Sequence, residues 1–382
     1  MRVAVNTLFL IPGEVGGSET YLRETLLAIA REHASIELIM VANRENNTLL
    51  RDLFGGFAQC SFRLLPVRAT NRYARIIAEQ TRLPWLLRKL KPDVLWSPGY
   101  TMPFGAPCSQ VVSILDMQYR SHPDDLTWLA RWTTHALVMM ASRRADRILT
   151  ISEFSKREIV EHTRCPTDRI TVTPLGVDPG FASTKNEKRK TENEMPATCN
   201  PQPYILSVAN SYPHKNLHRL VEAFGLLVDK IPHRLVLVGR PRLGEPQLAR
   251  AIEGVPEERI QRISGLSFEA LIALYQSADL FVFPSLYEGF GLPALEAMMV
   301  GVPVVTTHRG SIPEVCGDFA IYAEGTSVDD IASKVEEVLS WTAEQRAGHV
   351  ERARAHAMRF KWSATAQKTV NEFGSLTSSS GR

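Results

Sequence analysis

The chain has 382 residues, which is too long for one ordinary hydrophobic core, so we expect two domains of α/β size. Hydrophobic residues make up 44% and charged residues 22%, as is ordinary for a soluble globular protein. The net charge of +3 is too small to imply a nucleic-acid partner by itself.

The cysteine content and the start of the chain predict a cytoplasmic protein. The five cysteines are odd in number, widely spaced and without a CxxC pair, so neither a disulfide framework nor a zinc site is expected. The apolar run from Val3 to Ile11 is short and contains Asn6, which favours a first strand over a signal peptide. No stretch has the eighteen or so apolar residues that a membrane-spanning helix needs.

Strands alternate with helical stretches in both halves of the chain, and this alternation predicts parallel sheets with right-handed crossovers. Buried strands are expected at Arg2–Asn6, Ile36–Val41, Val94–Trp96, Val111–Leu115, Arg147–Ile151, Tyr204–Val208, Arg234–Val238, Leu280–Phe283 and Val304–Thr306. Helices are expected at Ser18–Glu32, Leu217–Lys230, Phe268–Ser277 and Val328–Leu339.

The domain boundary is expected in a polar, proline-bearing linker at residues 181–203, which lacks apolar periodicity. An N-terminal domain would then cover residues 1–180 and a C-terminal domain residues 204–359. A helix is predicted at about 360–374, and residues 375–382 are predicted to form a disordered tail.

The most informative segment runs from Pro284 to Glu296, directly after the predicted strand Leu280–Phe283. It is a loop with two glycines followed by a short helix, with Pro293 in the first turn and Gly301 as the C-terminal cap. Glycines let backbone N–H groups approach a ligand, and a helix start adds free donors and a positive dipole end. This pattern predicts a phosphate receptor with a glutamate on either side.

Several motifs together resemble glycosyltransferase family 4. These are Glu288-Gly-Phe-Gly-Leu-Pro-Ala-Leu-Glu296, Gly301-Val-Pro-Val-Val305, Gly310-Ser-Ile-Pro-Glu314, Tyr204-Ile-Leu-Ser-Val-Ala-Asn210, Pro213-His-Lys-Asn216, Leu149-Thr-Ile-Ser-Glu-Phe-Ser-Lys156, Pro174-Leu-Gly-Val-Asp178 and Gly16-Gly-Ser-Glu19. The resemblance covers most of the chain. It implies a retaining, nucleotide-sugar-dependent enzyme with the GT-B fold, in which two Rossmann-like, doubly wound domains face each other across a cleft. It also implies that the helix near the C-terminus crosses back onto the N-terminal domain.

Retaining glycosyl transfer places negative charge on the departing diphosphate, so hydrogen-bond donors must be aimed at it before the bond breaks. The backbone of Gly289, Phe290, Gly291 and Leu292 is expected to supply some of these donors. Lys215 is expected to supply another, because it follows a predicted strand and precedes a helix.

The family commonly has an arginine where this chain has Asn210, so one positive charge is lost at the diphosphate. Arg240 either replaces that charge in part or is an ordinary loop arginine. Many members of the family use no metal at the diphosphate, and no Asp-x-Asp pair lies in a suitable loop. We therefore predict no metal site and no cofactor besides the nucleotide sugar, which is a co-substrate.

The resemblance assigns the remaining donor contacts. Glu296 is expected to accept hydrogen bonds from the ribose, and Glu288 to hold hydroxyls of the transferred sugar or to stabilise charge near its anomeric carbon. Gly265 and Leu266 are expected near the nucleobase.

Two motifs of the first half are expected near the reacting sugar. Gly16 and Gly17 form a tight turn expected close to the sugar or the diphosphate, although a plain loop would show the same pattern. Many members of the family have His-Asp where this chain has Leu115 and Asp116. Asp116 is expected to orient or deprotonate the acceptor hydroxyl, and the missing histidine leaves the identity of the sugar open.

Basic residues are concentrated between Arg63 and Lys91, around the apolar stretch Leu83–Leu87, and Glu79 is the one acidic residue there. Such a segment suits a membrane surface with anionic lipid, and in the family this region often docks to a membrane. A solvated helix with its apolar face turned inward would show the same pattern. No aromatic platform or recognition motif for nucleic acid accompanies the basic residues.

The sequence therefore predicts a hexosyltransferase that acts on a glycan or lipid-linked acceptor in polysaccharide, lipopolysaccharide or glycolipid biosynthesis. GDP-mannose is the first expectation for the donor, and a UDP- or dTDP-sugar the second. The alternatives are a sugar-nucleotide epimerase or hydrolase of the same fold, and a catalytically silent subunit that binds nucleotide sugar. The enzyme is expected in the cytoplasm, with possible peripheral contact to the inner face of the membrane.

Overall fold

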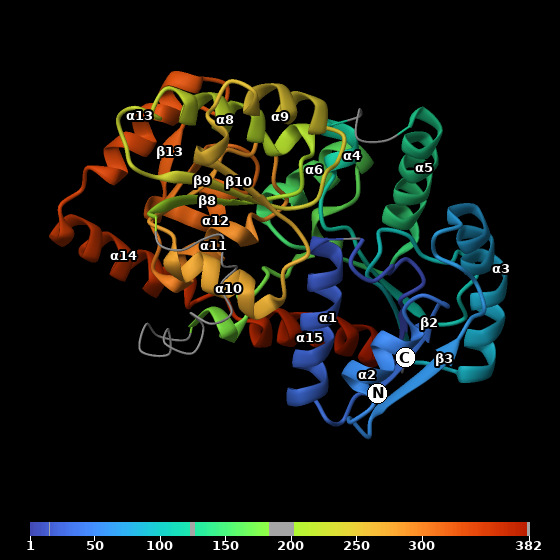
Figure 1. The fold of residues 1–382 in the computed structure, drawn as a ribbon. Coiled ribbons are helices and arrows are strands. Elements are labelled where there is room, and N and C mark those ends of the chain that lie inside the picture. The colour runs from blue at the N-terminus through green and yellow to red at the C-terminus, as the bar shows by residue number, and fades with distance from the viewer. Residues whose placement is uncertain (15, 123–126, 183–201, 380–382) are drawn as a thin grey trace. The chain divides into compact units, whose positions relative to one another are not determined.

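The computed structural model of the protein describes residues 1–14, 16–122, 127–182 and 202–379 (Figure 1). The chain forms two compact units, of which unit 1 comprises Met1–Gly176 with Trp362–Arg382 and unit 2 comprises Val177–Lys361. The predicted linker at residues 181–203 lies almost wholly outside the described residues.

Unit 1 contains a seven-stranded parallel sheet in the order β3-β2-β1-β4-β5-β6-β7. Its strands are β1 Arg2–Asn6, β2 Glu37–Ala42, β3 Cys60–Leu64, β4 Val94–Ser97, β5 Ser109–Ser113, β6 Arg147–Thr150 and β7 Ile170–Val172. Its helices are α1 Gly17–Glu32, α2 Asn47–Phe54, α3 Arg72–Leu90, α4 Gln118–Ser121, α5 Trp128–Arg144, α6 Glu153–Thr163 and α15 Trp362–Ser379.

Unit 2 contains a six-stranded parallel sheet in the order β10-β9-β8-β11-β12-β13. Its strands are β8 Tyr204–Val208, β9 Arg234–Val238, β10 Ile260–Ile263, β11 Leu280–Phe283, β12 Val304–Thr307 and β13 Ile321–Ala323. Its helices are α8 Leu217–Gly225, α9 Glu245–Ile252, α10 Phe268–Ser277, α11 Leu292–Val300, α12 Ile312–Cys316, α13 Val328–Leu339 and α14 Ala343–Ala357. Figure 1 shows α8, α9 and α13 on one face of this sheet and α10, α11 and α12 on the other.

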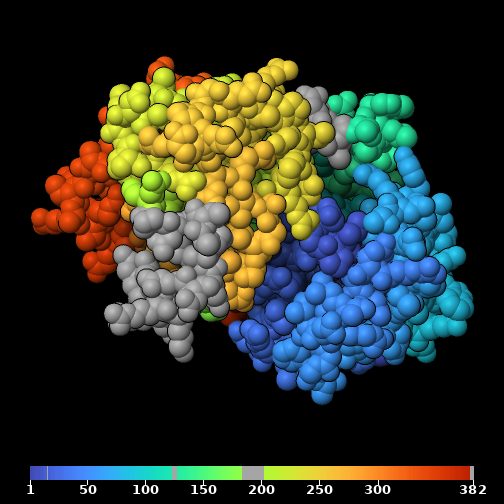
Figure 2. All heavy atoms as spheres, viewed as in Figure 1, coloured from blue at the N-terminus to red at the C-terminus, as the bar shows by residue number. Residues whose placement is uncertain are grey.

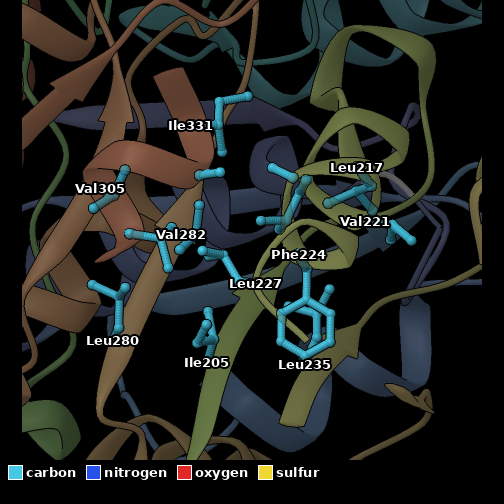
Figure 3. Packing of buried hydrophobic residues seen from close by; sticks show 14 of the residues in the cluster. Ile205, Leu217, Val221, Phe224, Leu227, Leu235, Leu280, Val282, Val305 and Ile331 are labelled. Atoms are coloured by element: carbon cyan, nitrogen blue, oxygen red, sulfur yellow. The ribbon is translucent and has the colours of Figure 1, made fainter. Parts of the chain in front are cut away.

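Apolar side chains from strands and helices fill the core on the α8 side of this sheet (Figure 3). Ile205 and Leu235 of the sheet meet Leu217 and Phe224 of α8 there, and all four are at most 5% exposed. The burial of these side chains is the main stabilising term for unit 2, at roughly 1.5 to 3 kcal/mol for each fully buried large apolar side chain.

Each sheet has a switch point, at which the chain order runs outward in opposite directions from two neighbouring strands. The two strands are β1 and β4 in unit 1, and β8 and β11 in unit 2. In open parallel sheets, ligands bind outside the carboxyl ends of the strands at such a point. The topology therefore marks one candidate ligand edge in each unit.

The predicted α/β class with two parallel sheets is confirmed, but four strands were missed. The missed strands are β3, β7, β10 and β13, which are the edge strands of the two sheets. Several of their side chains are exposed or half-buried, so these strands lack the continuous apolar run that marks a central strand.

Three predicted boundaries were wrong. The strand predicted at Val111–Leu115 lies two residues earlier, and the helix predicted to reach Lys230 ends at Gly225, where the chain continues in turns. The tail predicted to be disordered from residue 375 continues α15 as far as Ser379. There the hydroxyls of Ser375 and Thr377 hydrogen-bond back to the carbonyls of Glu372 and Gly374, an arrangement compatible with the helix.

The C-terminal helix α15 belongs to unit 1. Its Phe373 is fully buried, with its ring centroid 5.8 Å from that of Trp96 on β4. Glu372 accepts a hydrogen bond from Thr171 at 2.8 Å and forms an ion pair with Arg147 at 3.2 Å. Unit 1 is therefore built from both ends of the chain.

Candidate active site

The start of α11 presents free backbone donors at the carboxyl end of β11. Gly291 precedes the helix with φ of 95°, a left-handed conformation that a glycine adopts without strain, and no side chain caps the first turn. Within the described part of the chain, the N–H groups of Phe290, Gly291 and Leu292 have no hydrogen-bond partner. Free N–H groups and the positive end of the helix dipole together form an anion receptor.

Lys215 and Glu288 form an ion pair next to this receptor. The Lys215 Nζ donates to Glu288 Oε1 at 2.6 Å, and the two side chains are 20% and 9% exposed. The ammonium also lies 5.6 Å from the ring centre of Phe283, the last residue of β11. The structure thus joins two predicted site residues, one following β8 and one following β11, at the switch point of unit 2.

The main chain of Glu288 is held from the loop after β12. The backbone N–H and the hydroxyl of Ser311 both donate to the Glu288 carbonyl, at 3.1 and 3.0 Å. Gly310 has φ of 64°, and a Cβ built on it would lie 2.5 Å from that carbonyl oxygen. A glycine is therefore required at position 310 to let the two backbone segments approach each other.

Asn216 fixes the position of Lys215. It is fully buried, and its side-chain amide donates to the carbonyls of Pro284 and Gly325, at 3.0 and 2.7 Å. Because Pro284 begins the loop that contains Glu288, this amide connects the loops after β8 and β11. Asn216 was not predicted as a site residue, although it stands in the Pro213–Asn216 motif.

Glu296 lies in the second turn of α11 and is paired with Tyr275 of α10. The Tyr275 hydroxyl donates to Glu296 Oε2 at 3.0 Å. Burial raises the pKa of Glu296 from 4.5 to about 7; the hydrogen bond from Tyr275 acts in the opposite direction, and the negative charge of Asp178 adds to the rise. Phe181 packs edge-to-face on the Tyr275 ring at 5.4 Å and restricts its movement.

Asn210 and Arg240 lie together after β8 and β9. The Asn210 side-chain oxygen accepts a hydrogen bond from the Arg240 backbone N–H at 2.8 Å, and the Arg240 side chain is exposed. The asparagine therefore holds the end of β9 in this structure. Whether Arg240 supplies the missing positive charge stays a prediction.

Gly265 and Leu266 follow β10, the edge strand of unit 2. Gly265 is exposed, and Leu266 is half-buried. Three strand spacings of about 4.8 Å separate β10 from β11, so these residues lie roughly 14 Å along the sheet from the ion pair. Their predicted place near a nucleobase stays untested.

The predicted site residues of unit 1 gather at the carboxyl edge of its sheet. Gly16 precedes α1 with φ of 57°, and Gly17 is the first residue of that helix. Tyr100 hydrogen-bonds to both Ser18 and Asp116, and these contacts link the glycine turn to Asp116. The pKa of Tyr100 lies well above its usual value because the phenol is buried and Asp116 is negatively charged.

Tyr100 was missed in the sequence. It follows β4 and has φ of 68°, a left-handed conformation that is rare for an aromatic residue. Such strain is concentrated at functional sites. The Pro98-Gly99-Tyr100 sequence directly after a buried strand is the signal that could have indicated it.

Within residues 1–14, 16–122, 127–182 and 202–379, no three His, Cys, Asp or Glu side chains are grouped so that they could hold a metal ion. No helix of that same part is long and apolar enough to cross a membrane.

Comparison with known proteins identifies the family. Residues 15–181 match the family model described as Glycosyltransferase Family 4, and residues 188–356 match the one described as Glycosyl transferases group 1. The O-antigen chain mannosyltransferase B of Escherichia coli is 31% identical over 311 residues, which cover 76% of this chain and 77% of that protein. The chain therefore belongs to the glycosyltransferases. The MMP alpha-(1->4)-mannosyltransferase of Mycolicibacterium hassiacum is also similar, with 31% identity over 60% of this chain and 54% of that protein.

Solved structures show the same fold as this glycosyltransferase. A sucrose-phosphate synthase from Thermosynechococcus elongatus aligns with a TM-score of 0.79 and 17% identity, over 99% of this chain and 100% of that chain. A protein from Anabaena, solved in complex with UDP-glucose, aligns with a TM-score of 0.76 and 18% identity, over 98% and 100%. The glycosyltransferase has the GT-B fold, as the sequence predicted.

Proposed function

We propose that this glycosyltransferase transfers mannose from GDP-mannose to a hydroxyl of a glycan or lipid-linked acceptor, with retention of anomeric configuration. We place the reaction in polysaccharide, lipopolysaccharide or glycolipid biosynthesis. The observation that carries the proposal is the start of α11, where three free N–H groups stand in the chain between Glu288, which is paired with Lys215, and Glu296, which is paired with Tyr275. The similarity to mannosyltransferases supports the choice of sugar.

The proposed reaction breaks the bond between the anomeric carbon and the diphosphate oxygen and forms a bond from that carbon to the acceptor oxygen. The acceptor proton passes to the leaving phosphate or to Asp116. Negative charge grows on the diphosphate and positive charge on the sugar ring. Donors that are fixed in place before the reaction stabilise such charge without reorganising.

Each group of the proposed donor site has a separate role in this reaction. The N–H groups of Phe290, Gly291 and Leu292 and the Lys215 ammonium would hold the diphosphate. Glu288 would accept hydroxyls of the sugar or face the positive charge on its ring. In the structure Lys215 pairs with Glu288, so an arriving diphosphate would share the ammonium with that carboxylate. Glu296 has one oxygen bonded to Tyr275, and its other oxygen would accept a ribose hydroxyl.

The first test of the donor site is thermal unfolding with GDP-, UDP- and dTDP-sugars, using Glu296→Ala as the control. A ligand at a hundred times its dissociation constant stabilises the protein by about 2.7 kcal/mol, which raises the melting temperature by roughly 5–11 °C for a domain of this size. We expect this shift with GDP-mannose and its loss in the variant. No shift with any nucleotide sugar would contradict the donor site.

The second test follows the product. We expect transfer of mannose to an acceptor with the anomeric configuration of the donor, read from the C1–H1 coupling in NMR spectra. Turnover of the nucleotide sugar without an acceptor would instead identify an epimerase or a hydrolase. Binding without turnover for any acceptor would identify a silent subunit.

We also propose that unit 1 makes peripheral contact with an anionic membrane, through α3 together with α5. Leu83, Pro84 and Leu87 of the predicted basic segment are buried, but Trp85 of α3 is 57% exposed with the Lys89 ammonium 3.6 Å from its ring centre. The apolar stretch is thus turned inward in part, and its tryptophan remains available to lipid.

Helix α5 adds two tryptophans that the sequence analysis did not include. Trp128 and Trp132 are 69% and 62% exposed and lie one turn apart. Arg72, the first residue of α3, donates to the Thr134 hydroxyl of α5 at 2.6 Å, so the start of α3 contacts α5, and α5 is part of the molecular surface in Figure 2. Exposed tryptophan beside basic residues suits the headgroup region of anionic lipid.

Co-sedimentation with vesicles tests the membrane contact. We expect binding to vesicles of phosphatidylcholine with phosphatidylglycerol, little binding to phosphatidylcholine alone, and loss of binding in a Trp128→Ser, Trp132→Ser double variant. Leu226→Ser, at a 49% exposed residue of unit 2, is the matched control. Equal binding of the double variant and the unaltered protein would refute the contact.

A further inference from the structure

The switch point of unit 1 contains a buried carboxylate. Glu79 of α3 is 4% exposed, and it accepts hydrogen bonds from Asn6 at 2.6 Å and from Thr101 at 2.9 Å. Asn6 is the last residue of β1, and Thr101 follows β4. Glu79 therefore lies at the level of the strand ends, beneath the edge where ligands bind in such sheets.

Arg75 lies one helical turn from Glu79, on the same face of α3. Helix α3 follows the parallel strand β3, so it begins at the carboxyl edge of the sheet and runs back along it. Arg75 precedes Glu79 by four residues, which places it about 6 Å further out, beyond the strand ends. The arginine is thus at the rim of the crevice.

Among the described residues the guanidinium of Arg75 has no hydrogen-bond partner, and the favourable charge that acts on it is that of Glu79. The guanidinium makes no ion pair within the described part of the chain, although the Arg75 side chain is half-buried. The neighbouring Arg72 is occupied, because its Nη2 donates to Ala130 and Thr134 of α5, at 3.1 and 2.6 Å. Burial lowers the pKa of Arg75; the charge of Glu79 acts in the opposite direction, and Arg72 adds to the lowering.

Two arginines in the first turn of α3 are unfavourable for the helix itself. The positive end of the helix dipole repels them, and that turn contains no acidic residue. A half-buried arginine with all five donors unused in such a place is ready for a planar or tetrahedral anion, which it can bind through two parallel hydrogen bonds.

We propose that Arg75 binds an anionic group of the acceptor, either a phosphate or a carboxylate, at the switch point of unit 1. The inference rests on the proposed function only in naming the bound molecule as the acceptor. Thr101 donates to Glu79, and the adjoining Tyr100 hydrogen-bonds to Asp116, so the loop after β4 connects the helix that carries Arg75 with the proposed acceptor-orienting carboxylate. An acceptor held by its anion at Arg75 would present a nearby hydroxyl to Asp116.

The binding test uses three small probes, namely mannose 1-phosphate, glucuronic acid and neutral methyl α-mannoside. Their affinities are measured by ligand-observed NMR with the full chain, in the presence of excess GDP. The excess GDP is present to occupy the donor receptor of unit 2, so that the probes do not bind there. Lys215→Met, which alters that receptor, is a second control and should retain the binding of the charged probes. Arg75→Gln is expected to weaken one charged probe by roughly 10- to 100-fold, the range for losing a charge-assisted hydrogen bond, and to leave the neutral probe unchanged.

The weakened probe identifies the anion. Loss of mannose 1-phosphate binding indicates a phosphorylated acceptor such as a lipid-linked one, and loss of glucuronic acid binding indicates an acidic glycan. Arg44→Gln, an exposed arginine that follows β2 at the same edge, is the matched control and should change no affinity. Arg75→Lys retains the charge without the planar fork and should recover part of the binding.

Two results would overturn the site. One is unchanged affinity of both charged probes in Arg75→Gln; the other is an equal loss for the neutral probe, which indicates a purely structural role. The thermal shift with nucleotide sugars reports on unit 2 and does not depend on Arg75. Failure of the anion site is therefore distinguishable from failure of the proposed transferase function.

Discussion

The raised pKa of Glu296 predicts a specific dependence of stability on pH. Below about pH 4.5 the carboxyl group is protonated in both the folded and the unfolded chain, so it contributes no difference. Between pH 4.5 and about 7 the unfolded chain releases this proton and the folded chain retains it, so the free energy of unfolding falls as pH rises. Above about pH 7 both states are ionised and the loss is complete.

The size of the loss follows from the same values. A rise from 4.5 to about 7 corresponds to about 3 kcal/mol, at 1.36 kcal/mol for each pH unit. Because the Glu296 side chain is partly exposed, solvent screening reduces this figure, and we expect roughly 2 kcal/mol.

Comparison with Glu296→Gln isolates this group, since the other carboxyl groups titrate in both proteins. Urea unfolding is measured at pH values from 4.5 to 8, and the free energy of the variant is subtracted from that of the unaltered protein. We expect the difference to fall by roughly 2 kcal/mol between pH 4.5 and 7 and then to stay level. Glu351→Gln, at an exposed glutamate of α14, should give a flat difference.

The reasoning would be refuted by a flat difference for Glu296→Gln, or by a difference that rises with pH. Nucleotide binding provides a second readout of the same ionisation. The ionised carboxylate accepts ribose hydroxyls better than the acid does, so affinity should increase between pH 6 and 8 in the unaltered protein but not in the variant.

Three further predictions concern the donor receptor. Lys215→Met should lower the free energy of unfolding, measured with urea, by about 2 kcal/mol because it leaves the Glu288 carboxylate without its partner. A Lys215→Met, Glu288→Gln double variant should recover most of this loss, and no change in the single variant would contradict the pairing. Gly310→Ala should abolish transfer and lower the free energy of unfolding by at least about 1 kcal/mol, because the added Cβ meets the Glu288 carbonyl. Gly348→Ala, in open space on α14, should leave the free energy of unfolding unchanged or raise it by up to about 1 kcal/mol, and equal effects of the two variants would count against the close approach. Tyr275→Phe removes the hydrogen bond that positions Glu296, so it should reduce the preference for a ribonucleotide over its 2′-deoxy form by roughly 5- to 10-fold in competition binding. An unchanged preference would contradict the positioning role of the Tyr275 hydroxyl.

The sequence by itself determined the parts of this protein that depend on local signals. The alternation of strands and helices predicted two parallel sheets, and the predicted bounds of β1, β8, β9 and β11 agree with the structure. The α11 segment was predictable because a buried strand, a glycine loop, an early proline and a C-terminal glycine follow one another within about twenty residues.

Only the tertiary structure decided which side chains meet. Lys215 and Glu288 are 73 positions apart, and they meet because β8 and β11 are neighbours in the sheet. Gly310 and Tyr275 gave no sign in the sequence of their contacts with Glu288 and Glu296. The free guanidinium of Arg75 is likewise a property of the folded chain, since the sequence shows only one basic residue among many. Sheet order, burial and the occupancy of hydrogen-bond donors arise from long-range packing, which local sequence patterns do not encode.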